Sequence, residues 1–178
     1  MIKSSFAAVA GPRTRVLVLG SLPGEASLRA AEYYAHPANH FWRLMAAVTG
    51  RDLVGQPYAA RLGTLLDAGV GLWDVIGAAR RDGSLDAKIR DHTPNALRAF
   101  IETLPALRAI GFNGRKASDI GRRQLGAGPA PELFTLPSSS PAHAVPLARK
   151  QAEWMQLKPF LDPGPAPRLT AFEGEDWT

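Results

Sequence analysis

The stretch Arg15–Gly24, with the sequence RVLVLGSLPG, joins an unbroken apolar run to a turn of small residues. Apolar side chains at every position from Val16 to Leu19 predict a strand covered on both faces, which is typical of a parallel sheet. Sheets of this kind bind ligands beyond the carboxyl ends of their strands. The glycines and the proline after Leu19 therefore predict a backbone loop that can approach a ligand closely.

Similar apolar runs alternate with helical patterns along the rest of the chain. Further strands are predicted at Val70–Val75, Leu107–Phe112 and Glu132–Leu136. The predicted helices are Phe41–Thr49, Tyr58–Ala68, a helix from Pro94 to about Thr103 with Thr93 as its N-cap, Gly114–Leu125 and Leu147–Leu161. This order predicts an α/β fold, a three-layer α/β/α sandwich around a central, mainly parallel four-stranded sheet.

The composition is that of one ordinary globular domain, with 178 residues of which 46% are hydrophobic and 21% charged. The absence of cysteine excludes disulfides, iron–sulfur clusters and Cys-ligated zinc. No apolar run is long enough to span a bilayer and no secretion signal is recognisable, so a cytoplasmic location is expected. Residues 1–161 are predicted to form a single domain, and the acidic Pro/Gly-rich tail at 162–178 is predicted to be extended or disordered.

The charge distribution points to a polyanionic partner. The whole chain has a net charge of +5. The twenty basic and twelve acidic residues before Asp162 give that part a net charge of +8. So basic a small domain attracts polyanions, and nucleic acid is the obvious example. An Arg-rich composition that serves solubility alone is the alternative interpretation.

The predicted strands end in loops of small or polar residues, which places the expected site among four loops. These are Gly20–Gly24, Trp73-Asp74, Asn113-Gly114 and Pro137–Pro141. The loop at Asn113 leads into a predicted helix that begins with Arg115 and Lys116. A helix N-terminus with two cations fits phosphate binding, although an ordinary helix start is the plainer interpretation.

The segment Tyr33–Trp42, YYAHPANHFW, crowds four aromatic residues, two histidines and an asparagine into ten positions. A purely structural role would require a buried partner for every one of its polar groups. Phe41 and Trp42 are expected to begin a helix and to pack in the core. His36 and His40 have a spacing that metal sites use, but a proline separates them and no third ligand lies nearby, so no metal is predicted.

The segment Pro137–His143 places three serines between two prolines. A serine nucleophile with His143 as its base is conceivable, but the Gly-x-Ser-x-Gly elbow of such enzymes is missing. Contacts from hydroxyl and backbone groups to phosphate oxygens are the preferred interpretation, with a solvated loop as the alternative.

Taken together, these segments resemble the uracil-DNA glycosylase superfamily in order and spacing over roughly residues 14–161. Tyr34–Trp42 is similar to the Phe-Ala-His-Pro-Ala-Asn-x-Phe-Trp run of the mismatch-specific (G:U/T) glycosylases. The sequence resembles the hypoxanthine-DNA (deoxyinosine) glycosylase branch, called family 6, more closely still. The segments that carry this resemblance are Gly20–Gly24, Ser27, Tyr33-Tyr34, Trp73–Gly77 and Gly83–Asp86.

The resemblance implies an enzyme that flips a deaminated base out of DNA and hydrolyses its N-glycosidic bond without cofactor or metal. It implies that Asn39 is the catalytic residue and that Tyr34 stacks on the flipped base. The implied base pocket is formed by Gly20, Ser21, Leu22, Pro23, Gly24, Tyr34 and Asn113. The implied DNA contacts are Gly114, Lys116, Ser138, Ser139, Ser140, Pro141, Ala142 and His143.

Two departures from the family pattern shape the expected activity. Leu22 stands where the mismatch branch carries the asparagine that positions water, which disfavours ordinary uracil excision and leaves Asn39 as the principal side chain. Ala142 stands where the uracil enzymes carry a leucine wedge, so another side chain such as His143 is expected to help. Asp74 and His36 are secondary candidates, Asp74 either as a general base or as a residue that fixes its loop.

The leading hypothesis is a monofunctional deoxyinosine glycosylase that starts base excision repair, because no lysine or amino terminus occupies a Schiff-base position in these motifs. One alternative is a uracil or G:U/G:T mismatch glycosylase, and another is a non-catalytic nucleic-acid-binding domain of the same fold. The expected partner is DNA containing deaminated bases. The protein is expected to be a monomer associated with the nucleoid, without membrane contact.

Overall fold

The structure is a computed structural model that describes residues 1–128 and 131–162. The predicted tail at 162–178 therefore lies, apart from Asp162, outside the described residues. Within the described ranges, no helix combines the length and the apolar character needed to cross a membrane.

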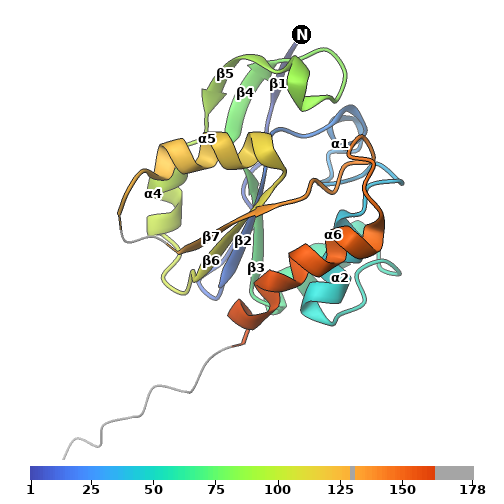
Figure 1. Cartoon of the computed structure of the whole chain (residues 1–178), viewed down its shortest axis with the longest axis vertical. Coiled ribbons are helices and arrows are strands. Elements are labelled where there is room, and N and C mark those ends of the chain that lie inside the picture. Colours follow the sequence, from blue (N-terminus) through green and yellow to red (C-terminus); the bar gives the residue numbers. More distant parts are fainter. Residues whose placement is uncertain (129–130, 163–178) are drawn as a thin grey trace, which may run out of the picture.

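A four-stranded parallel sheet forms the centre of the molecule and confirms the predicted sheet (Figure 1). Its strands are β2 (Val16–Gly20), β3 (Val70–Asp74), β6 (Ala109–Asn113) and β7 (Glu132–Leu136), in the order β3-β2-β6-β7. β2 pairs in parallel with both β3 and β6 and is buried along its whole length. The unbroken apolar run of this strand thus reflects a central position with both faces covered.

Helices cover both faces of this sheet, which confirms the three-layer sandwich (Figure 1). Val16 and Val18 pack in one hydrophobic cluster with α2 (Phe41–Thr49), α3 (Tyr58–Asp67) and α6 (Leu147–Trp154). Leu17 and Leu19 point the other way and pack with α4 (Leu97–Glu102) and α5 (Arg115–Leu125). The two-residue period of a strand therefore divides one apolar run between two cores.

A second, antiparallel sheet was not predicted. It joins β1 (Ile2–Ser4), β4 (Ile76–Arg80) and β5 (Arg90–Pro94) in the order β1-β4-β5. Two short helical segments, α1 (Glu25–Ala30) and η1 (Asp86–Lys88), were not predicted either. Figure 1 shows this sheet at one end of the molecule, beyond the central sheet.

The predicted start of α4, with Thr93 as the N-cap and Pro94 in the first turn, is wrong. Thr93 and Pro94 pair with Ala78 and Ile76 in the antiparallel sheet, and the helix begins at Leu97 instead. Proline is tolerated there because β5 has a neighbour on one side only. The last helix also ends earlier than predicted, at Trp154, and continues as a 3-10 helix, η2 (Met155–Phe160), around Pro159.

Candidate functional site

A cavity of about 400 Å³ opens at the carboxyl ends of the central strands. The loops after β2, β3, β6 and β7 line it, together with segments 33–39 and 84–86. Each site residue proposed from the sequence lies on its wall, namely Gly20, Ser21, Leu22, Pro23, Gly24, Tyr34, His36, Asn39, Asp74, Asn113, Gly114, Lys116, Ser138, Ser139, Ser140, Pro141, Ala142 and His143. The position of the strand ends explains why these distant loops meet.

Gly20 allows two polar side chains to converge on the pocket. A Cβ atom at this position would lie 2.5 Å from Asp74 Oδ1 and 3.2 Å from the Tyr34 hydroxyl oxygen. Because the first distance is shorter than any normal contact, a side chain at residue 20 would displace the carboxyl. The last residue of β2 must therefore be glycine, because the Asp74 carboxyl and the Tyr34 hydroxyl occupy the space that a side chain would need.

Tyr34 is held in an uncommon conformation beside the cavity. Its φ angle of 55° lies in the left-handed region, and its ring stacks on Phe41 with a centroid distance of 3.8 Å. Its hydroxyl is buried and has no hydrogen-bond partner among the described residues. Burial, with a contribution from the charge of Asp74, raises the pKa of Tyr34, so the phenol is neutral. Since Phe41 covers one face of the ring, a base could stack only on the other.

Two carboxyl groups border the same pocket. Asp74 is only 3% exposed, and its Oδ2 has no hydrogen-bond partner in the described part of the chain. Burial, followed by the charge of Asp86, raises the pKa of Asp74 to about 7. Burial also raises the pKa of Asp86, whose Oδ1 accepts a 2.6 Å hydrogen bond from Ser21 Oγ. A carboxyl pKa raised by burial at a cavity wall is typical of functional sites, which makes Asp74 a candidate for a chemical role.

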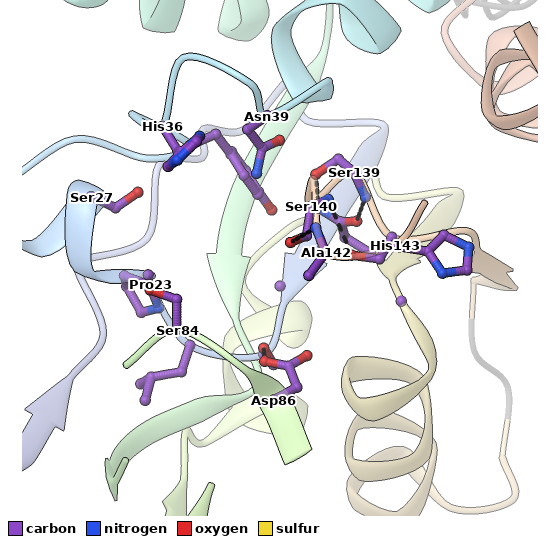
Figure 2. Close-up of a pocket in the computed structure, with 18 of the residues that line it drawn as sticks. Pro23, Ser27, His36, Asn39, Ser84, Asp86, Ser139, Ser140, Ala142 and His143 are labelled. Atoms are coloured by element: carbon purple, nitrogen blue, oxygen red, sulfur yellow. Dashed lines mark hydrogen bonds between the residues drawn. The ribbon is translucent and has the colours of Figure 1, made fainter. Parts of the chain in front are cut away.

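Asn39 uses one end of its amide for structure and leaves the other available. Its Oδ1 accepts a 2.9 Å hydrogen bond from the backbone N–H of Phe41, at the start of α2. No described residue accepts a hydrogen bond from its Nδ2, and Figure 2 shows this nitrogen directed toward the middle of the pocket. The first turn of the helix thus fixes the amide orientation in which a donor faces the cavity.

The loop after β7 is held mainly by its own polar groups and by Asn113. Asn113 Nδ2 donates to Ser139 Oγ at 2.8 Å, and Ser139 N donates to Asn113 Oδ1 at 2.8 Å. Behind the loop, the fully buried Lys150 donates to the Ser140 carbonyl at 3.1 Å. Asn113 and Ser139 therefore bond to each other, and their side chains shape the pocket wall.

The serine hydroxyls give no support to a serine nucleophile. Ser138 Oγ accepts a hydrogen bond from Ser140 N, and Ser140 Oγ accepts one from Ala142 N. Among the described residues, no hydrogen bond joins the imidazole of His143 to any of these hydroxyls. These serines build a compact loop, in which the backbone N–H groups of Ser140, Ala142 and His143 donate to acceptors of the loop itself.

The two histidines that suggested a metal are engaged differently. His36 Nδ1 accepts a hydrogen bond from Ala38 N at 3.1 Å, which closes a local turn. His40 Nδ1 is buried without a partner in the described part of the molecule. Over residues 1–128 and 131–162, no group of three or more potential metal ligands comes together.

The N-terminus of α5 contributes positive charge to the rim. Gly114 precedes the helix with a φ of 96°, and Arg115 and Lys116 follow it on the wall of the cavity. Eleven residues of helix align their peptide dipoles behind this end. Backbone N–H groups, the helix dipole and two cations together favour a phosphate near the pocket.

Known proteins with a similar sequence identify the class of protein to which this fold and pocket belong. Residues 8–162 match the Uracil DNA glycosylase superfamily, and the chain belongs to this family. A hypoxanthine DNA glycosylase of Methanosarcina acetivorans is 42% identical over 86% of this chain and 96% of its own length. A second hypoxanthine DNA glycosylase, from Methanosarcina barkeri, is 37% identical over 88% of this chain and 98% of its own length.

The same architecture occurs in a solved structure. A solution NMR structure of a Methanosarcina acetivorans protein, provisionally labelled a uracil DNA glycosylase, superposes with a TM-score of 0.78 at 40% identity. The similarity covers 90% of this chain and 99% of that one. The expected family and fold class are both confirmed.

One wall of the pocket was not predicted from the sequence. Ser84, Leu85 and Asp86 line the cavity from the loop after β4. The Gly83–Asp86 motif contributed to the family resemblance, but its residues were assigned no role. These residues reach the pocket through contacts with distant parts of the chain, which no local sequence pattern predicts. An example is the hydrogen bond between Ser21 and Asp86, which are 65 positions apart.

Proposed function

We propose that this protein is a monofunctional DNA glycosylase that removes hypoxanthine from DNA by hydrolysing the N-glycosidic bond of deoxyinosine. Asn39 carries the proposal, because its Nδ2 faces the pocket as a hydrogen-bond donor that no described residue uses. The two relatives of 37% and 42% identity named hypoxanthine DNA glycosylase support the same substrate.

The reaction needs the target base outside the helix, because the bond to be cut is otherwise stacked inside the duplex. The C1′–N9 bond breaks with its electron pair leaving on the purine, and a water oxygen bonds to C1′. One proton of that water is lost and the purine gains one. In this scheme Asn39 Nδ2 donates a hydrogen bond to the departing purine while the amide orients the water. An amide has no ionisation that would impair this role at any physiological pH.

Asp74 is the second candidate for a chemical role. With a pKa of about 7, it populates both protonation states near neutrality. Its neutral form would donate a hydrogen bond to the base, and its ionised form would draw a proton from water. Asn39 is preferred as the principal residue because a charged carboxylate at this place would repel the purine anion as it leaves.

DNA would be held by charge and by hydroxyl groups around the cavity. Arg115 and Lys116 at the start of α5 fit one phosphate, and the hydroxyl groups of Ser138 and Ser140, which accept hydrogen bonds in the loop and can still donate, fit another. A single chain supplies every part of this arrangement, so we propose that the protein acts as a monomer. A genomic DNA substrate would bring it to the nucleoid.

A uracil or mismatch glycosylase is the second candidate function. The provisional label of the solved relative favours it. Against it stands Leu22, a buried apolar residue on the pocket wall that can neither accept nor donate a hydrogen bond with its side chain. A non-catalytic DNA-binding domain is disfavoured by the available amide of Asn39 and by the proton exchange expected of Asp74.

The test uses duplex oligonucleotides that contain a single deoxyinosine, uracil, xanthine or mismatched thymine. After incubation with the protein, alkali cleaves any abasic site, and the products are separated by length. Cleavage of the deoxyinosine strand only after alkali is expected. Cleavage of the uracil strand alone would support the second candidate, and no cleavage of any strand would overturn both.

A further inference from the structure

One large apolar side chain stands exposed at the rim of the pocket. Four such side chains are exposed among the described residues, and Leu85 is the member of this group that lines the cavity. It is 49% exposed and packs in neither hydrophobic cluster. The folded protein therefore leaves Leu85 in water where the substrate must approach, at a cost in free energy that burial would remove.

The backbone that carries Leu85 is fixed on both sides. The Gly83 carbonyl accepts a 2.8 Å hydrogen bond from Lys3 Nζ, and Ser84 Oγ accepts a 2.9 Å hydrogen bond from Glu25 N. On the other side, Ser21 Oγ donates to Asp86 Oδ1. An exposed side chain on so constrained a loop is preorganised for contact with a partner.

The opposite rim lacks a side chain of this kind. Figure 2 shows Ser84 across the pocket from Ala142 and His143. Ala142 offers a single methyl group, and the imidazole of His143 is polar and exposed. A nucleotide that leaves the duplex leaves an apolar gap between two base pairs, and such gaps are commonly filled by an inserted apolar side chain.

We propose that Leu85 is this wedge: it enters the base stack from the rim formed by segment 84–86 and occupies the space of the extruded nucleotide. The inference rests on the proposed function, since it requires a flipped nucleotide. Asp82 and Asp86 flank Leu85 in the chain, but four basic residues near this rim favour DNA over an apolar protein surface as the partner. Lys88 and Arg90 follow Leu85 in the chain, and Arg115 and Lys116 line the same cavity.

The decisive test is a flipping assay with Leu85→Ala and the control Val54→Ala. Val54 is 48% exposed, close to the value of Leu85, but does not line the pocket. A duplex carries 2-aminopurine beside the deoxyinosine, and its fluorescence rises when the neighbouring base leaves the stack. We expect Leu85→Ala to reduce this rise at saturating protein by about tenfold, because the gap is no longer filled. Val54→Ala should match the wild type, and an undiminished rise for Leu85→Ala would overturn the proposal.

A second measurement separates the wedge from a structural role. Single-turnover cleavage is compared on duplex and single-stranded deoxyinosine substrates, because only the duplex has a stack to invade. The ratio of duplex to single-strand rates should fall about tenfold in Leu85→Ala and recover in Leu85→Met. An equal loss on both substrates would assign Leu85 to the fold instead. If the wild type cleaves neither substrate, the proposed glycosylase function fails, and the fluorescence result still decides the wedge.

Discussion

At the scale of single residues, the pocket is defined by polar groups left without partners. Asn39 Nδ2, the Tyr34 hydroxyl and Asp74 Oδ2 have no hydrogen-bond partner among the described residues. Buried polar atoms such as those of Tyr34 and Asp74 are usually satisfied, so their place on the same cavity wall as the Asn39 donor points to a ligand. The resemblance to the family named Asn39 and Tyr34, Asp74 was a secondary candidate, and the structure places all three on the wall of one cavity.

Asn39→Ala is expected to reduce single-turnover cleavage of deoxyinosine by about 10²–10³, the usual cost of removing one preorganised donor. Folding and overall DNA affinity should stay close to wild type, as read by thermal melting and by anisotropy. Asn39→Asp should be equally poor, because a carboxylate cannot donate. An inactive Asp74→Ala beside a nearly active Asn39→Ala would reverse the two roles.

Replacing Tyr34 separates its ring from its hydroxyl. Because the hydroxyl is unpartnered and the ring stacks on Phe41, Tyr34→Phe should retain most activity. Tyr34→Ala should weaken binding of deoxyinosine DNA by about 1–3 kcal/mol through loss of stacking. Titration of both variants by anisotropy measures this, and a severe loss in Tyr34→Phe would make the hydroxyl the working group.

Asp74 should make stability depend on pH. The pKa of this carboxyl is about 7 in the folded protein against an ordinary value of 3.8, so the folded state holds its proton more tightly. The resulting stabilisation is complete below about pH 4 and is lost as the pH rises through about 7. Melting temperatures of the wild type and Asp74→Asn, measured from pH 4 to pH 8, should therefore shift in favour of the variant as the pH rises. A constant difference would contradict this.

At the scale of elements, the unpredicted antiparallel sheet shapes the pocket wall. Arg81 follows β4, is almost fully buried, and donates hydrogen bonds to the carbonyls of Leu22 and Pro23. Lys3 of β1 pairs with Glu25 at the start of α1. The Gly20–Gly24 loop of the pocket and the start of α1 are thus fastened by side chains from a different sheet.

Arg81→Met should loosen this loop. Loss of the hydrogen bonds from a charged donor is expected to lower the free energy of unfolding by about 1–3 kcal/mol. Amide hydrogen exchange in residues 20–25 should become faster, as mass spectrometry of peptides can show. Arg80→Met is the matched control, since Arg80 is exposed on β4 and should change neither quantity. Equal exchange in both variants would remove Arg81 from this role.

Continuous apolar runs made the central strands predictable, whereas the second sheet left little trace in the sequence. β1 has three residues, and β5 is exposed at all five positions, so neither shows a hydrophobic pattern. The Thr93-Pro94 pair has the composition of a helix start, but pairing with β4 overrides this local preference. The site residues at strand ends were predictable from topology, while Asp86 and Leu85 depended on tertiary contacts.

At the scale of the whole molecule, charge governs the approach of DNA. The part of the chain before Asp162 has a net charge of +8, and Arg115 and Lys116 at the start of α5 line the cavity. Binding should therefore be insensitive to sequence, and the affinity should fall by on the order of a decade or more between low and physiological salt. Anisotropy across a salt series measures this, and salt-independent binding would contradict the proposed partner.

Lys116→Ala should reduce the slope of log affinity against log salt by about 1, the contribution of one phosphate contact. The base that is removed should not change. Lys158→Ala is the control, because Lys158 is exposed in η2 and does not line the pocket. Identical slopes for the two variants would contradict a phosphate contact at the start of α5.

The buried Lys3 bears on how the protein should be handled. Its ammonium reaches from the third residue of the chain to the Gly83 carbonyl and Glu25, and the Met1 carbonyl accepts a hydrogen bond from Arg81 N. A deletion through Ser4 would remove these contacts and so disturb the fastening of pocket loops that lie far away in the sequence. Samples for the assays above should therefore retain residues 1–4.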